Sequence, residues 1–159
     1  MTARARAASP RLSLSIQSGD GAPAWPVHRS RLRRWVAAAL RADARIALRL
    51  VGAREGRELN RAFRGRDYAT NVLTFVYDRP PAPRAGGAGA VADVVVCLPV
   101  AAREARAQRK PLEHHIAHLV VHGVLHAQGF DHESDSDARA MEQREREVLA
   151  RFRVPDPYR

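Results

Sequence analysis

The chain has 159 residues, a formal net charge of +10 and a single cysteine, a length that suits one domain with a hydrophobic core better than two. One cysteine excludes an internal disulfide, and a membrane-spanning helix is excluded because no apolar run approaches roughly 18 residues. We therefore expect a soluble, cytoplasmic protein with no membrane partner.

The positive charge is almost wholly arginine, since Lys110 is the only lysine. Guanidinium groups bind phosphates through paired hydrogen bonds, so this surplus favours nucleic acid over a membrane surface as a partner. A compositional bias towards arginine and alanine, without a role in binding, is the alternative explanation. The two explanations are compatible.

The first half of the chain predicts a tail, two strands and a helix. Residues 1–10 are basic and aperiodic, so we expect a disordered tail before a single domain at 11–159. Apolar and polar residues alternate over 12–17, which predicts the first strand. A helix capped by Ser30 with a basic exposed face follows, and 45–51 alternates again as the second strand.

The middle of the chain predicts a short helix, a strand and a loop. The helix covers 55–64 and ends at Gly65. Three of its residues are expected to face the core: Leu59, Ala62 and Phe63. Residues 72–77 are rich in β-branched and aromatic residues and predict the third strand. Residues 78–90 consist largely of proline, glycine and alanine, so we expect a flexible loop inside the domain.

The last strand is predicted at 91–98, where a nearly continuous apolar run is typical of a central strand covered on both faces. We expect Cys97 to pack at its end as a small apolar residue. Pro99 opens a helix that runs to about Gln108, and Pro111 starts a histidine-rich helix.

A final helix, capped by Ser134 or Ser136, is expected to pack through one apolar face: Ala138, Met141, Glu145, Val148, Leu149 and Phe152. The order of elements then predicts an α+β fold, with a single mixed four-stranded sheet packed with about five helices.

The histidines are concentrated in one segment: all except His28 lie between His114 and His132. Those at 114, 118, 122 and 126 recur at four-residue spacing, which places them on one helix face. Two successive rings can bind one ion, because zinc–nitrogen bonds are about 2.0–2.1 Å long. Three cannot, since three rings in a row span about 12 Å, so a third ligand must come from chain that turns back.

Gly129 provides that turn, three residues after His126, where a left-handed residue ends a helix. The chain can then return His132 towards His122 and His126. The pattern H-x-x-x-H-x-x-G-x-x-H offers three neutral nitrogen ligands and an open fourth position, the arrangement of a catalytic zinc site. We predict one Zn²⁺ per chain, bound on this central helix and the turn after it.

Four neighbouring residues lie outside the predicted ligand set. We place His114, His115 and His118 outside the ligand set, with His118 a candidate to face the substrate channel. Asp131 is either a turn residue or an acceptor that orients a ligand imidazole.

The same spacing occurs in the metzincin proteases, H-E-x-x-H-x-x-G-x-x-H, so a metallopeptidase is one alternative. Those enzymes place a glutamate general base directly after the first histidine, where this chain has Gly123. The remaining candidates to stabilise a transition state are basic, and guanidinium donors suit a charged phosphoryl centre. The basic composition therefore favours hydrolysis of RNA or DNA.

Four segments carry a resemblance to a known family. HGVLHAQGFDH at 122–132 resembles the signature of the YbeY-type endoribonucleases, the bacterial ribosomal RNA maturation factors. LNRAFRGRDYATNVLTF at 59–75 is similar to that family's second signature, and the likeness extends to ADVVVC at 92–97 and PDPY at 155–158. Ala92 is a departure, because the family usually has glycine before the aspartate.

The resemblance implies an α+β fold, zinc on His122, His126 and His132, and single-strand-specific RNA hydrolysis. It also implies roles in small-subunit rRNA 3′-end maturation and in ribosome quality control. The family's functional arginine corresponds to Arg64, which could otherwise simply complement the helix dipole.

The implied partners are single-stranded RNA, ribosomal RNA and the ribosomal small subunit, with a ribosomal protein or an assembly GTPase as a further candidate. The alternative from a different class is a ribosome-assembly binding protein whose metal mainly stabilises the fold.

Overall fold

The computed structural model describes residues 9–79 and 89–159. Most of the predicted tail at 1–10 and of the predicted loop at 78–90 lies outside these residues. The elements are β1 (Leu12–Ser18), α1 (Arg29–Ala39), β2 (Ala44–Val51), α2 (Ala53–Arg64), β3 (Val72–Asp78), β4 (Ala90–Cys97), α3 (Leu98–Ala107), α4 (Leu112–Ala127) and α5 (Asp135–Ala150). No helix in this part of the chain is long and apolar enough to cross a bilayer.

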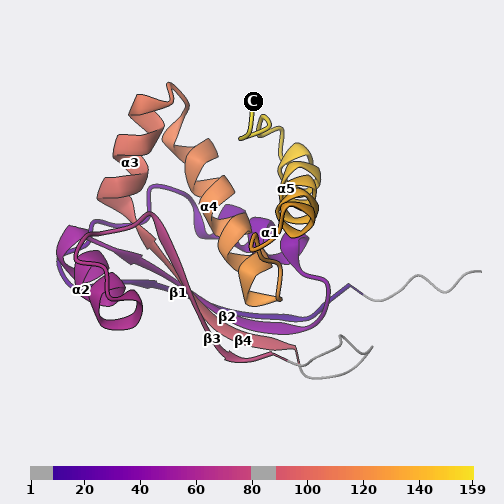
Figure 1. Cartoon of the computed structure of the whole chain (residues 1–159), viewed down its shortest axis with the longest axis horizontal. Helices are drawn as coiled ribbons and strands as arrows, with labels where there is room; N and C mark the ends of the chain where they lie inside the picture. Colours follow the sequence, from indigo (N-terminus) through magenta and orange to yellow (C-terminus); the bar gives the residue numbers. More distant parts are fainter. Residues whose placement is uncertain (1–8, 80–88) are drawn as a thin grey trace, which may run out of the picture.

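The sheet is mixed, with the strand order β1-β2-β4-β3. The first three strands in this order are parallel, and β3 runs antiparallel along the outer edge of β4. The mixed four-stranded sheet and its helices confirm the predicted α+β fold (Figure 1).

The helices divide between the two faces of the sheet. Helices α1, α4 and α5 pack together over one face, where the main core includes Trp35, Leu48, Val94, Val120 and Leu149. Helix α2 packs on the opposite face against a smaller core that contains Leu73, Val95 and Cys97. It lies at one end of the strands, so in the described part of the chain much of that second face carries no helix (Figure 1).

The helix ends follow local backbone chemistry. Gly65 and Gly129 have φ angles of +68° and +103°, the left-handed conformation predicted for both. Ser134 caps α5 by accepting a hydrogen bond from the Asp137 amide at 3.1 Å, as expected. The cap predicted at Ser30 was wrong, because α1 begins at Arg29 and the ring of His28 accepts from the Ser30 amide.

The last strand differs in detail from its prediction. It ends at Cys97, and Leu98 already belongs to α3. It is covered on both faces only over its second half, from Val94 to Cys97, whereas Val91 and Asp93 are partly exposed. Cys97 is buried at the strand end as predicted, and Ala92 packs in the main core.

The inward face predicted for helix α2 is correct only in part: Leu59 is partly buried against the smaller core as predicted, but the other two residues are not. Ala62 and Phe63 are exposed, and Phe63 has 67% of its surface accessible. The buried positions are instead Gly56 and Asn60. Gly56 lets the helix approach Cys97, since a Cβ there would lie 3.0 Å from the sulfur, and the Asn60 side chain donates to the Tyr68 carbonyl at 2.7 Å.

Helix α4 approaches the sheet closely at Gly123. A Cβ at this position would lie 2.5 Å from a methyl group of Val94 on β4, and 3.3 Å from side-chain atoms of Val72 and Thr74 on β3. The Thr74 hydroxyl donates to the Gly123 carbonyl at 3.2 Å. No side chain fits here without displacement, which explains the absence of a glutamate after His122.

We predict that Gly123→Ala destabilises the fold, although alanine has the higher helix propensity by about 1 kcal/mol. Forcing an extra methyl into a packed core typically costs about 1–3 kcal/mol. Thermal denaturation measures the change. In a Val94→Ala background the closest contact is gone, so the same substitution should destabilise the fold less. An equal loss in both backgrounds would contradict this packing.

Candidate metal centre and its cavity

Three histidines converge at the end of α4. The candidate ligand atoms of His122, His126 and His132 all lie within 4.8 Å of one another. The two Nε2 atoms of His126 and His132 are 3.1 Å apart, close to the roughly 3.3 Å that separates two nitrogens bound at 2.0–2.1 Å to a tetrahedral ion. Helix α4 supplies the first two rings one turn apart, and the turn at Gly129 returns the third.

The protonation state of His126 is compatible with binding of a metal ion. Burial, together with the neighbouring His122 and His132 rings, lowers the pKa of His126 to about 4. Its ring is therefore neutral at physiological pH, which is the form of imidazole that binds metal ions. The donor set of three imidazoles is one that zinc and other late transition metals prefer.

Glu145 on α5 hydrogen-bonds His122 on the side of the ring that faces away from the cavity. Its carboxylate is fully buried, and Oε1 accepts a hydrogen bond from His122 Nδ1 at 2.7 Å. Burial favours a raised pKa for this carboxyl, but hydrogen bonds from His118 and His122 outweigh it and lower the pKa to about 2. An ionised acceptor on Nδ1 fixes the His122 tautomer that leaves Nε2 for a metal.

The other oxygen of Glu145 is also occupied. His118 Nε2 donates to Oε2 at 2.8 Å, and the Tyr158 hydroxyl donates to the same atom at 2.6 Å. Tyr158 thus contacts both helices on the side away from the cavity: its hydroxyl bonds Glu145 on α5, and its ring packs against His118 on α4. Sequence reasoning treated Glu145 as a packing residue; an acidic side chain in an otherwise apolar helix face was the signal of a buried partner.

The remaining candidates have other roles. Asp131 accepts the Glu133 amide at 2.7 Å, the hydrogen bond of a turn residue. His118 contacts Glu145 and does not line the cavity in front of the ligands. His115 pairs with Glu104 on α3, and His114 lines a separate hollow beside α1.

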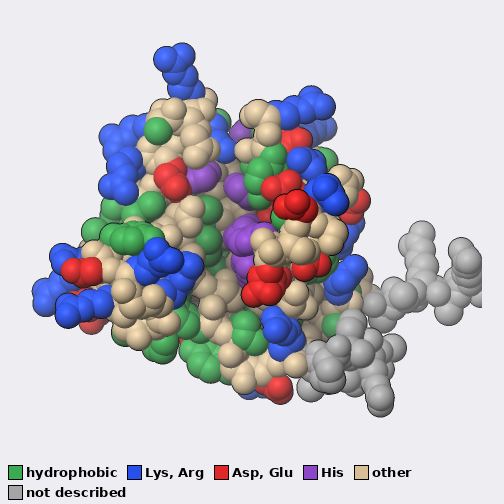
Figure 2. Space-filling view, in the orientation of Figure 1, with side chains coloured by type: hydrophobic (Ala, Val, Ile, Leu, Met, Phe, Trp, Pro, Cys, Tyr) green, Lys and Arg blue, Asp and Glu red, His purple; other side chains and the backbone are tan. Residues whose placement is uncertain are grey.

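The histidine group opens into a cavity of about 510 Å³. Its walls come from α4, the turn after it, the end of α2 and the edge strand β3: Arg64, Thr70, Asn71, Val72, Leu73, Thr74, Val76, Arg79, His122, His126 and His132. Figure 2 shows the histidine side chains in this hollow, with basic side chains beside it. The walls hold no carboxylate among the described residues, so the cavity favours an anionic ligand.

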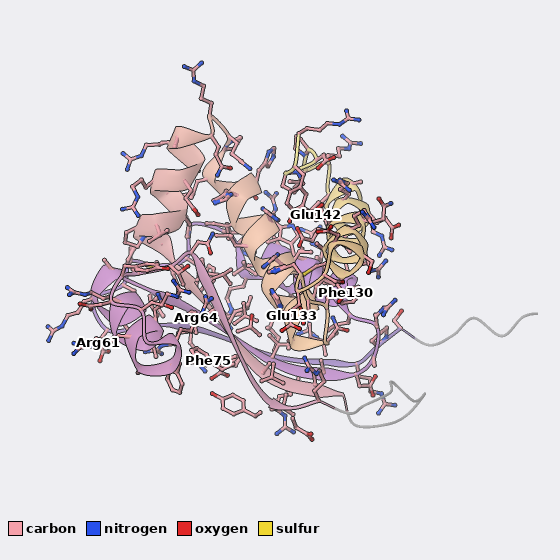
Figure 3. The ribbon with its side chains drawn as sticks, in the orientation of Figure 1. Arg61, Arg64, Phe75, Phe130, Glu133 and Glu142 are labelled. Carbon is pink, nitrogen blue, oxygen red and sulfur yellow. The ribbon has the colours of Figure 1, made fainter. Side chains whose placement is uncertain are left out.

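Arg64 lies at one side of this cavity, on the last turn of α2 (Figure 3). Within the described chain its guanidinium has no ion pair or hydrogen bond, unlike Arg57 on the same helix, which pairs with Asp67 at 2.7 Å. Arg64 and the histidine group therefore line one cavity. A position in the last helical turn is also what the helix-dipole alternative expects.

Arg79 is a cavity residue that sequence reasoning missed. It follows β3, and its guanidinium donates to the His126 carbonyl at 3.4 Å. Its side chain also passes Gly129 closely, since a Cβ there would lie 3.6 Å from Arg79 Cδ. The only sequence feature that could have indicated Arg79 is its position as a basic residue directly after β3.

Comparison with known proteins identifies relatives over nearly the whole chain. The family model described as Endoribonuclease YbeY matches residues 26–153. Proteins named endoribonuclease YbeY from Aromatoleum aromaticum and Bordetella pertussis are 53% and 55% identical to this chain. The first alignment covers 99% of each chain, and the second covers 92% of this chain and 96% of its relative.

A solved structure supports the fold. The solution structure of a protein from Thermotoga maritima matches with a TM-score of 0.54 and 24% sequence identity. The match covers 92% of this chain and 99% of that protein. At this level of identity the likeness concerns the fold alone.

We predict that Glu145→Gln lowers the affinity for Zn²⁺ by about 10–100-fold, the usual effect of losing a carboxylate behind a ligand imidazole. The amide preserves the volume of the side chain but replaces one acceptor oxygen by a donor. Competition for zinc with a chelator measures the affinity. Glu147→Gln, an exposed change on the same helix, is the matched control. Wild-type zinc affinity in a folded Glu145→Gln protein would disprove the orienting role.

Proposed function

The chain belongs to the endoribonuclease YbeY family, and we propose that it is a zinc-dependent endoribonuclease that cleaves single-stranded RNA during ribosomal RNA maturation. The observation that carries this proposal is that Arg64 and the histidine group line one cavity. A phosphodiester in that cavity can contact the metal position and a guanidinium together.

Zinc fits the histidine group better than harder cations do. Three imidazoles with no carboxylate form a nitrogen donor set, whereas Mg²⁺ and Ca²⁺ prefer oxygen ligands. We assign His122, His126 and His132 as the ligands of one Zn²⁺ per chain. When bound, a zinc ion with an open position polarises a phosphoryl oxygen and activates water for hydrolysis.

The protein's own contribution is to bind and orient the phosphate. Arg64 can donate two parallel hydrogen bonds to phosphate oxygens, and charge develops on those oxygens in the transition state. Arginine stays protonated, so this residue stabilises charge and does not transfer a proton. Arg79 at another wall of the cavity adds a second positive charge, and Gly123 leaves no room for a peptidase general base.

We base the proposed cellular role on membership of the endoribonuclease YbeY family. We place the activity in the cytoplasm, at maturation of the small-subunit rRNA 3′ end and in ribosome quality control. The small subunit, with a ribosomal protein or an assembly GTPase, would present the RNA. The excess of arginine over acidic residues supports such a polyanionic partner.

Arg64→Ala should lower the rate of RNA cleavage by about 10²–10³-fold, as removal of a transition-state donor typically does. Zinc content and Tm should stay unchanged, because the side chain is exposed. Arg64→Lys should recover little activity, since an ammonium group cannot form the paired hydrogen bonds. Cleavage of an unstructured RNA under single-turnover conditions measures the rate.

Arg61→Ala is the matched control for this experiment. Arg61 lies on the same helix, is exposed, and lines a separate hollow with Arg57 and Asp67 (Figure 3). It should cleave at the wild-type rate. If Arg64→Ala also cleaves normally, or if it unfolds, Arg64 only terminates its helix. If wild-type protein binds ribosomal subunits without cleaving any RNA, the assembly-factor alternative is correct.

The metal assignment predicts about one zinc per purified chain and a lower Tm after chelation, because an ion bound only by the folded state stabilises that state. His132→Ala should release zinc most readily, since this ligand lies on the turn and not on α4. Elemental analysis and thermal denaturation measure both effects. Full zinc occupancy in the double variant His122→Ala/His126→Ala would refute the ligand assignment.

A further inference from the structure

Three aromatic side chains lie exposed or half-exposed beside the cavity, and nothing in the proposed chemistry uses them. Phe63 and Tyr77 each have 67% of their surface accessible, and Phe75 is partly buried. The rings of Phe63 and Phe75 meet edge to face with their centroids 4.7 Å apart. Single exposed aromatic residues are ordinary, but a group of them marks a binding surface. We call these three residues the aromatic surface.

The aromatic surface and the cavity lie on opposite sides of one strand. Successive side chains of a strand point to opposite faces, and Val72, Thr74 and Val76 of β3 line the cavity. Phe75 therefore points to the other face of the sheet, towards α2 (Figure 3). Val76 is 41% exposed at the rim between the two.

Tyr77 is held on the same face as Phe75. In the antiparallel register Phe75 lies opposite Asp93 of β4, and the Tyr77 hydroxyl donates to the Asp93 carboxylate at 2.6 Å. This hydrogen bond raises the pKa of Tyr77, so the hydroxyl stays protonated. The bond fixes the ring while leaving most of its surface accessible, which lowers the entropic cost of binding a ligand there.

Helix α2 connects the two sites. Phe63 and Arg64 are consecutive in its last turn, so their side chains point in directions about 100° apart. Arg64 lines the cavity, whereas Phe63 contacts Phe75 on the far side of β3. A chain bound at Arg64 reaches the aromatic surface by crossing the edge strand, which has no further strand beyond it in the described sheet.

The charge around the aromatic surface fits a polyanion. Arg66 is exposed two residues after Arg64, and Arg45 is exposed on β2. Arg45 of β2 lies opposite Val91 of β4, and Val91 shares a face of the sheet with Asp93 because the two residues are two positions apart. Arg45 is therefore on the same face as Phe75 and Tyr77. Aromatic rings among arginines are the usual composition of a single-strand nucleic-acid surface, whereas apolar protein interfaces are depleted in charge at their core.

We propose that Phe63, Phe75 and Tyr77 stack against bases of the same RNA strand whose phosphate lies in the cavity. This inference rests on the proposed ribonuclease function and adds to it a site for the nucleotides beside the cleaved bond. Stacking requires an accessible base face, which a paired base in a duplex does not offer. The aromatic surface therefore selects single-stranded RNA by contacts outside the catalytic cavity.

The test uses full-length zinc-loaded protein and an unstructured oligoribonucleotide that contains 2-aminopurine, whose fluorescence falls on stacking. Phe63→Ala and Tyr77→Ala should each raise KM for cleavage about 5- to 100-fold, the loss expected for one base stack, with kcat little changed. Stopped-flow mixing should show a smaller fluorescence decrease. Phe63→Tyr keeps a ring and should behave as wild type. Tyr77→Phe keeps the ring but loses the hydrogen bond to Asp93, so it should raise KM less than Tyr77→Ala does.

Phe63→Leu separates stacking from a merely apolar contact, because it keeps hydrophobic area without a π face. It should resemble Phe63→Ala, and a wild-type KM in this variant would overturn the proposal. So would wild-type KM and fluorescence in both alanine variants. If wild-type protein shows ring-dependent stacking without cleavage, the aromatic surface stands while the ribonuclease proposal fails. If it neither binds nor cleaves RNA, both proposals fail.

Discussion

The close contact between α4 and the sheet at Gly123 determines the character of the whole site. Because no Cβ separates the helix from Val94, α4 lies directly on β3 and β4. His122 and His126 are thereby placed above the edge strand, facing the end of α2 that carries Arg64. The same contact removes the position at which a metallopeptidase carries its glutamate. The resulting cavity is lined by imidazole, guanidinium and neutral groups, which suits a phosphodiester.

The ligand group is supported from a second direction by the C-terminal part of the chain. Glu145 on α5 joins His118 and His122, and Tyr158 fills the remaining position on its carboxylate. A buried ionised carboxylate is stable only when it is hydrogen-bonded in this way. The packing of α5 and the orientation of His122, a proposed metal ligand, are therefore coupled. Substitutions far from the cavity can therefore alter the orientation of His122 through this contact.

Local signals made part of this structure predictable. His122, His126 and His132 lie within one helix and the turn after it, so spacing and one left-handed glycine sufficed to bring them together. Glu145 could not be found in that way, because its partners come from another helix and only the packing of α5 on α4 brings them together. Part of the inward face of α2 was predicted wrongly: Leu59 does pack inward, but Phe63 was placed inward because it is apolar, whereas Gly56 and Asn60 take the buried positions. Helical periodicity alone did not resolve which apolar residues are buried.

The central claim is that the metal position and Arg64 act on one phosphate. A crystal structure of the zinc-loaded protein with a short RNA analogue that resists hydrolysis tests it most directly, because anomalous scattering locates the zinc independently of the ligand. We expect zinc on His122, His126 and His132, with one phosphate group in contact with both the ion and the Arg64 guanidinium. An RNA phosphate bound to zinc while Arg64 points away into solvent, or RNA bound outside the cavity, would contradict this account.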